Sequence, residues 1–138
     1  MKYREFKTSS GAKIILGKDA KSNDEIMRKF EGKENIIIHT VAPGSPFCII
    51  DDLKPSRKDI AEAAGACVFH SQDWRDNSGN VKVNIFTGKD VEKKKGMKAG
   101  TWKVTKSKTK IIKKRKIINL IKNVKNMSNP VGKAGNNR

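Results

Sequence analysis

Apolar and polar positions along the chain predict alternating short strands and helices. Segments of strand length occur at residues 2–9, 12–16, 35–41, 46–50, 81–87, 102–105 and 109–112. The segment 81–87 alternates apolar and polar residues, which is typical of a strand with one buried face. Stretches rich in Ser, Asn and Gly separate many of these segments and predict turns.

Two helices are predicted within the first half and just beyond it. Residues 24–30 form a short helix with N-cap candidates at 22–25, and its apolar residues share one side. A longer helix begins at Ser56, whose spacing to Asp59 resembles a capping box, and we expect it to end near Trp74. This helix is rich in alanine, so it is narrow enough to lie close against a sheet.

The C-terminal part is predicted to contain a lysine-rich loop at 88–100 and a basic amphipathic helix at 116–127. Mixed strands and helices joined by hairpin-length connections favour an α+β fold. We expect a mixed, largely antiparallel sheet covered by the alanine-rich helix, with a C-terminal basic helix. The expected organisation is a folded domain at 1–106, a basic strand–helix extension at 107–127 and a disordered tail at 128–138.

The excess of basic side chains favours a polyanion as the binding partner. The formal net charge is +17, and residues 71–138 contribute 19 basic and 4 acidic side chains to it. Such a charge attracts polyanions and says little about fold. Cys48 and Cys67 lie in apolar runs and are interpreted as core residues in a reducing compartment. No signal-like segment or membrane span is predicted, so a cytoplasmic protein is expected.

Basic residues of the second half are the candidate nucleic-acid contacts. Flexible lysines beside glycines can contact adjacent phosphates without reading bases. A solvated charge run is the alternative for the loop alone, but the second basic run at 103–116 favours an extended patch. The candidates are Lys89, Lys93, Lys94, Lys95, Lys98, Lys103, Lys106, Lys113, Lys114, Arg115 and Arg75.

Aromatic residues are too few for a stacking surface, so recognition by shape and phosphate is expected. Phe86 fits the buried face of its strand and is predicted to lie in the core. The positions of Trp74 and Trp102 stay open between core and surface.

Catalysis would have to use a few isolated side chains. His39 and Ser45 could share a pocket, but no acid is spaced to orient the histidine and no nucleophile elbow is present. His70 and Cys67 are two metal ligands, which do not make a zinc site. No phosphate-binding or dinucleotide motif occurs. No catalytic residue, metal or cofactor is therefore predicted.

The order of several motifs resembles the NFACT RNA-binding domain, which occurs in ribosome quality-control proteins related to Rqc2 and RqcH and as stand-alone proteins. The resemblance spans about residues 3–105. It rests on Tyr3-Arg4-Glu5-Phe6 with Gly11, on Gly17-Lys18-Asp19-Ala20 with Asn23-Asp24, on Ile36 to Ser45, on Val91 to Gly100, and on Trp102-Lys103-Val104.

This resemblance implies binding to ribosomal or transfer RNA near the large ribosomal subunit, by a stand-alone member of the family. It also implies residues that shape the edge of the site: Asn23, Asp24, His39, Pro43, Gly44 and Ser45. Ile37-Ile38 stand where the family signature has two aromatic residues, and Pro46 stands where it has histidine. The second departure weakens a catalytic role for the turn.

Three hypotheses follow. The first is a binder of structured RNA linked to the ribosome or its quality control; replacing Lys93, Lys94 and Lys95 with alanine should flatten the salt dependence of its binding by up to about three units. The second is an RNA-modifying enzyme that uses His39 with Ser45. The third is a binder of DNA or of an anionic surface, since charge alone does not choose a polyanion.

Overall fold

Six antiparallel strands form the central sheet of the computed structural model, which describes residues 3–124. Its order is β1-β2-β4-β3-β5-β8. The strands are β1 (Tyr3–Lys7), β2 (Lys13–Gly17), β3 (Ile36–Thr40), β4 (Cys48–Ile50), β5 (Val81–Thr87) and β8 (Lys108–Ile112). A second, two-stranded sheet pairs β6 (Val91–Glu92) with β7 (Lys103–Val104), and a 3-10 turn at Gly88–Asp90 precedes it.

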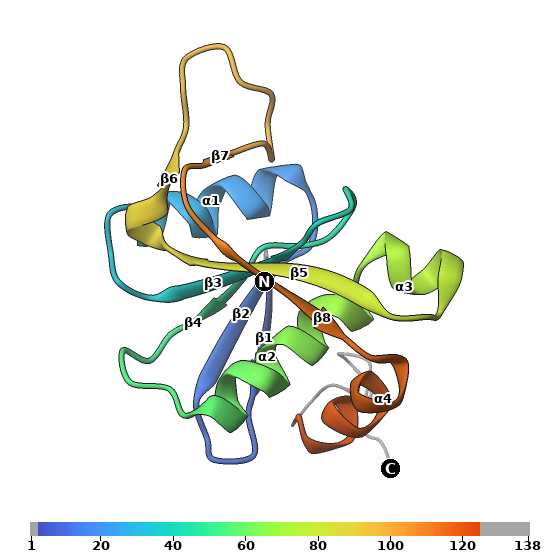
Figure 1. Ribbon diagram of the computed structural model, residues 1–138. Coiled ribbons are helices and arrows are strands. Elements are labelled where there is room, and N and C mark those ends of the chain that lie inside the picture. The colour runs from blue at the N-terminus through green and yellow to red at the C-terminus, as the bar shows by residue number, and fades with distance from the viewer. Residues whose placement is uncertain (1–2, 125–138) are drawn as a thin grey trace.

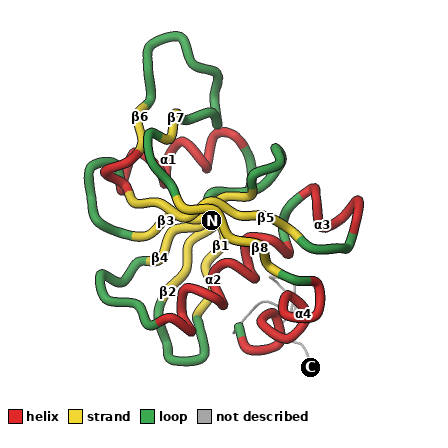
Figure 2. The backbone as a smooth tube through the Cα atoms, viewed as in Figure 1, coloured by secondary structure: helices red, strands yellow, loops and turns green. Residues whose placement is uncertain are grey.

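Helices cover both faces of the central sheet (Figures 1 and 2). They are α1 (Ala20–Phe30), α2 (Arg57–Phe69), α3 (Gln72–Asn77) and α4 (Lys114–Asn123). Successive side chains of a strand point to opposite faces. In β2, Ile14 and Leu16 therefore pack with α2, whereas Ile15 packs with α1. This arrangement confirms the α+β fold with its alanine-rich helix.

The C-terminal strand and helix belong to the same core. β8 pairs with β5 at the sheet edge, and Ile117 and Leu120 of α4 are buried against α2. A Cβ placed on Gly65 would lie 2.8 Å from the Cβ of Leu120, so the missing side chain permits this close helix contact. Residues 107–124 thus pack against the rest of the domain; the predicted tail at 128–138 lies outside the described residues.

Several predicted boundaries were wrong. Helix α1 begins at Ala20, because Asp19 is its N-cap and forms a capping box with Ser22. Helix α2 ends at Phe69 rather than near Trp74, because the Ser71 hydroxyl caps the short helix α3. The segment at 102–105 pairs with residues 91–92, which were predicted as loop, and not with the central sheet.

Two buried carboxylates fasten the β1–β2 turn to α2. Asp59 accepts hydrogen bonds from the hydroxyls of Thr8 (2.8 Å) and Ser10 (2.6 Å). Glu62 accepts from the backbone and the hydroxyl of Ser9, both at 2.7 Å. Burial alone would raise the pKa of Asp59, but the hydrogen bonds outweigh it and lower the pKa to about 2.

Other predictions concern buried residues and membranes. Cys48 and Cys67 are fully buried free thiols, as expected of core residues, and burial raises the pKa of both. Phe86 is buried in the core cluster on the α1 side, as predicted.

Among the described helices, none has the length and apolarity needed to cross a membrane.

Candidate nucleic-acid interface

The β6–β7 loop (residues 93–102) projects from the body of the protein (Figure 1) and is held by one carboxylate. Oδ1 of Asp24, on α1, accepts hydrogen bonds from the Gly100 N–H (3.0 Å) and Trp102 Nε1 (2.9 Å), and lies 3.2 Å from Lys93 Nζ. Burial acts to raise the pKa of Asp24, but these hydrogen bonds keep it below its usual value. The carboxylate is therefore ionised at neutral pH and fixes the base of the loop.

The lysines of the loop divide into two kinds. Lys93 donates to the carbonyls of Lys98 (2.6 Å) and Thr101 (2.8 Å) as well as contacting Asp24, and its side chain is only 10% exposed. Lys94, Lys95 and Lys98 are exposed. The geometry thus gives Lys93 a role in holding the loop, while its three neighbours face solvent.

Trp102 is part of this support. It is 7% exposed, and the cations of Arg28 and Lys93 lie 5.7 and 5.6 Å from its ring centroid. Trp74 is partly buried against the core. The open question about the tryptophans is therefore answered for Trp102, which has little surface left on which a base could stack.

The second basic group follows the loop along the chain. Residues 103–112 run from the β6–β7 loop to α4, which lies at the other end of the molecule (Figure 1). The exposed cations of residues 103–116 form no ion pair with any carboxylate within residues 3–124. Lys89, by contrast, pairs with Glu34 at 3.2 Å. The predicted contacts on this stretch are Lys103, Lys106, Lys113, Lys114 and Arg115.

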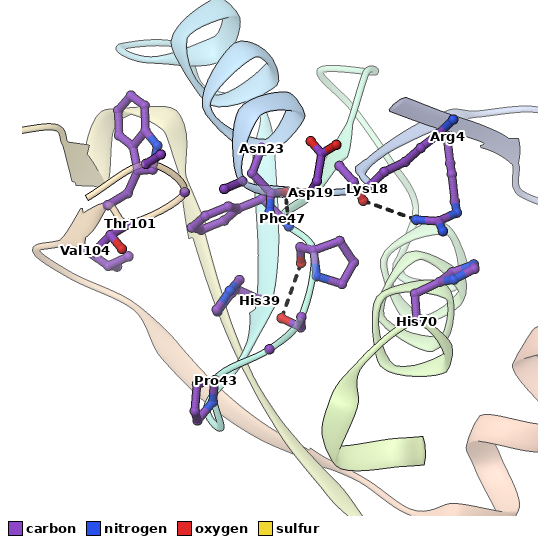
Figure 3. Close-up of a pocket in the computed structure, with 18 of the residues that line it drawn as sticks. Arg4, Lys18, Asp19, Asn23, His39, Pro43, Phe47, His70, Thr101 and Val104 are labelled. Atoms are coloured by element: carbon purple, nitrogen blue, oxygen red, sulfur yellow. Dashed lines mark hydrogen bonds between the residues drawn. The ribbon is translucent and has the colours of Figure 1, made fainter. Parts of the chain in front are cut away.

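A pocket of about 530 Å³ lies beside the β6–β7 loop (Figure 3). Figure 3 shows Arg4 and His70 on one side, Thr101 and Val104 on the other, and His39, Pro43 and Phe47 between them. The lining contains six residues predicted for the site: Asn23, His39, Pro43, Gly44, Ser45 and Arg75. Sequence reasoning missed Arg4 and His70 as lining residues.

Two glycines let the walls of the pocket come together. Gly44 has φ +92°, and a Cβ there would lie 2.8 Å from the Cβ of Gln72. Gly100 has φ +81°, and its Cβ would lie 3.0 Å from the Cα of Ala20. Only glycine adopts such conformations without strain, so the turn at 43–45 and the β6–β7 loop can approach α3 and α1.

His39 and Ser45 are near one another but are not arranged as a catalytic pair. The Ser45 hydroxyl accepts from the Thr40 N–H (3.0 Å) and donates to the Pro46 carbonyl (3.3 Å). The His39 ring stacks on Phe47 at 4.4 Å, and burial lowers its pKa. A neutral ring held by stacking, beside a hydroxyl already used by the backbone, favours a binding role.

Positive charge gathers at the other side of the pocket. Arg4 donates to the Gly17 carbonyl (3.3 Å), and Arg75 donates to the His70 carbonyl (3.5 Å) and to Gln72 Oε1 (3.0 Å). Burial, and then the two arginines, lower the pKa of His70 to about 4. Within the described chain neither guanidinium has a carboxylate partner, so both charges are available to an anion.

Arg4 could have been suspected from the sequence, because it lies in the first motif of the family resemblance. Its approach to Arg75 could not, because the two residues are distant in the chain and lie on different elements, β1 and α3.

Sequence comparisons with known proteins point to one family. The family model of the NFACT protein RNA binding domain matches residues 2–106. The chain is 31% identical over 95 residues to the archaeal Rqc2 homolog aRqcH of Methanocaldococcus jannaschii, covering 66% of this chain and 14% of that protein. It is 28% identical over 96 residues to the Rqc2 homolog RqcH of Bacillus subtilis, covering 69% of this chain and 16% of that protein.

A solved structure shares the fold. It is the C-terminal part of the fibronectin/fibrinogen-binding protein from Streptococcus suis, with a TM-score of 0.74 and 25% identity, and the match covers 86% of this chain and 49% of that one. The chain spans well under a fifth of the two Rqc2 homologs it matches. Because the family model matches residues 2–106, which is most of the chain, this chain belongs to the NFACT RNA-binding domain family.

Proposed function

We propose that this protein binds structured RNA through phosphate contacts and shape, in the setting of the ribosome or its quality control. The observation that carries the proposal is a series of exposed cations from the β6–β7 loop through β8 to α4, which form no ion pair within residues 3–124. The family match and the two Rqc2 homologs support RNA as the polyanion.

The structure narrows the proposed contacts. Lys94, Lys95 and Lys98 extend into solvent from a loop that is already fixed, so each can neutralise a phosphate. Lys93 and Lys89 already have acidic partners. Replacing Lys93 would release the loop as well as remove a charge, so a triple substitution that includes it confuses two effects.

The first test compares two triple variants with equal loss of charge. Lys94→Ala/Lys95→Ala/Lys98→Ala should weaken binding to transfer RNA and to large-subunit rRNA fragments, and should reduce the salt slope by up to about three units. Affinity is measured as a function of salt concentration for each RNA. The matched control is Lys7→Ala/Lys54→Ala/Lys58→Ala, whose lysines are exposed on other parts of the surface.

A control variant that flattens the salt slope of RNA binding as much as the loop variant would mean that net charge binds RNA without a site.

DNA and anionic vesicles at matched salt test the choice of polyanion, and equal competition by either would contradict a preference for RNA. Crosslinking in cells, followed by sequencing of the attached RNA, tests the ribosomal setting: reads concentrated on large-subunit rRNA or on transfer RNA support it, and reads that follow RNA abundance contradict it.

A further inference from the structure

The pocket beside the β6–β7 loop has two different walls. One carries Arg4 and Arg75, and the other carries the stacked pair of His39 and Phe47 together with the backbone at 99–101. Figure 3 shows Arg4 on one side of the space, and His39, Phe47 and Thr101 across from it. A ligand that fits must present negative charge at one end and a flat apolar group at the other.

Among residues 3–124, neither Arg4 nor Arg75 forms an ion pair with a carboxylate. Arg4 and Arg75 line the same pocket, and the pKa of Arg4 is lowered first by burial and then by the charge of Arg75. Both are oriented by neutral acceptors: the Gly17 carbonyl, the His70 carbonyl and Gln72 Oε1. The acid in the lining is Asp19, whose carboxylate accepts the Ser22 N–H as the N-cap of α1. An anion between the guanidinium groups would therefore relieve repulsion between like charges.

The opposite wall suits a base. The neutral His39 ring, backed by Phe47 at 4.4 Å, is of the kind on which unstacked bases lie. Gly100 and Thr101 line the same space, with the Gly100 N–H bonded to Asp24 and the Thr101 carbonyl bonded to Lys93. The volume, about 530 Å³, lies within the range of about 300–1,000 Å³ typical of small-ligand pockets.

The position of the pocket points to a nucleotide within a strand rather than a free one. Its wall at residues 99–102 belongs to the β6–β7 loop, and the exposed Lys98 and Lys103 flank that segment. Phosphates on either side of an inserted nucleotide would therefore meet lysines of the proposed contact surface.

We infer that the pocket holds one unstacked nucleotide of the bound RNA, with its phosphate between Arg4 and Arg75 and its base against His39. This inference rests on the proposed function, because it names the part of the RNA that enters the site. RNA with an unpaired nucleotide is then the preferred substrate over a perfect duplex.

The test uses the full chain and two RNA hairpins that differ only in a single-nucleotide bulge. The unchanged protein should bind the bulged hairpin at least about tenfold tighter, a difference of about 1.4 kcal/mol. Arg75→Gln removes the charge of an exposed side chain and should lower affinity for the bulged hairpin more than affinity for the duplex, so that the preference is lost. His39→Ala should do the same through the base, and Lys94→Ala/Lys95→Ala/Lys98→Ala should weaken both hairpins alike.

The outcomes separate the two proposals. Equal affinity of the unchanged protein for both hairpins overturns the nucleotide pocket and leaves RNA binding intact, whereas no binding to either hairpin overturns the proposed function itself. NMR titrations with the four ribonucleoside monophosphates and with inorganic phosphate give a direct reading at Gly100 and Thr101. Larger shifts with nucleotides than with phosphate support the inference. Identical shifts, or tight binding of free nucleotides without a preference for the bulge, overturn it.

Discussion

At the scale of single residues, the pocket contains an imidazole kept neutral by its surroundings. The His70 ring lies parallel to Phe6 with centroids 5.7 Å apart and meets Phe69 edge-on. Its Nε2 is buried without a hydrogen-bond partner among the described residues. Protonation would not relieve this, because burial and two arginines oppose a further positive charge.

Substitution of Arg75 should therefore change the titration of His70. The pKa of His70 is about 4 in the unchanged protein, and Arg75→Gln should raise it, because a neighbouring positive charge is removed. The pKa should stay below 6.5, the ordinary value, since burial is the larger cause and persists. NMR titration of the two histidines measures this, with His39 as the internal reference. A His70 pKa that does not move would place Arg75 outside its electrostatic reach.

At the scale of elements, helices α2 and α4 pack closely against one another. A Cβ on Gly65 would approach the Cβ of Leu120, an atom near the backbone that cannot rotate away. The amphipathic stripe of α4 was recognisable in the sequence, but its partner helix was not, because a glycine within a helix signals packing only once the neighbour is known.

Gly65→Ala should destabilise the protein despite the better helix propensity of alanine. Propensity favours the change by about 1 kcal/mol, whereas overpacking costs about 1–3 kcal/mol, so a net loss of up to about 2 kcal/mol is expected. Urea unfolding measures the loss, and hydrogen exchange at Ile117 and Leu120 should show α4 released first. Lys58→Ala, on the exposed side of α2, is the control. A more stable Gly65→Ala protein would contradict the close contact.

Prediction from sequence succeeded best where periodicity and capping agree. The Ser56 capping box and the alternation in β5 gave those elements their correct starts. The predicted start of α1 was wrong because Asp19, and not a residue of 22–25, is the N-cap. The predicted end of α2 was wrong because Ser71 caps a separate helix within a pattern that looked continuous. Side-chain hydrogen bonds decided both, and apolar spacing does not report them.

The candidate site was predictable in parts. Exposed lysines could be proposed from charge, and the turn at 43–45 from a family resemblance. The structural role of Lys93 could not be predicted from a run of three lysines, because this role depends on the contact of Lys93 with Asp24 in the folded chain.

At the scale of the whole molecule, stability should depend on acid through Asp59. The carboxylate has a pKa of about 2 when folded and about 3.9 when unfolded. Its stabilising contribution is thus complete above about pH 4 and is lost as the pH falls toward 2. Unfolding in urea across this range measures the slope.

Asp59→Asn should make the protein less stable near neutral pH and should flatten the acid slope, because the titrating group is gone. Asp52→Asn, at an exposed position, should leave the slope largely as it was. A slope that Asp59→Asn does not alter would mean that other carboxylates control acid unfolding.

The single carboxylate of Asp24 has a further consequence for the β6–β7 loop. Ordering a free backbone costs about 1–2 kcal/mol of conformational entropy for each residue. Because three donors of the loop meet one acceptor, this entropy is lost when the protein folds and not when RNA arrives. The binding free energy from contacts of the exposed lysines is then reduced less by the entropy of ordering the loop. A change that frees the loop from Asp24 would therefore lower affinity without removing any phosphate contact.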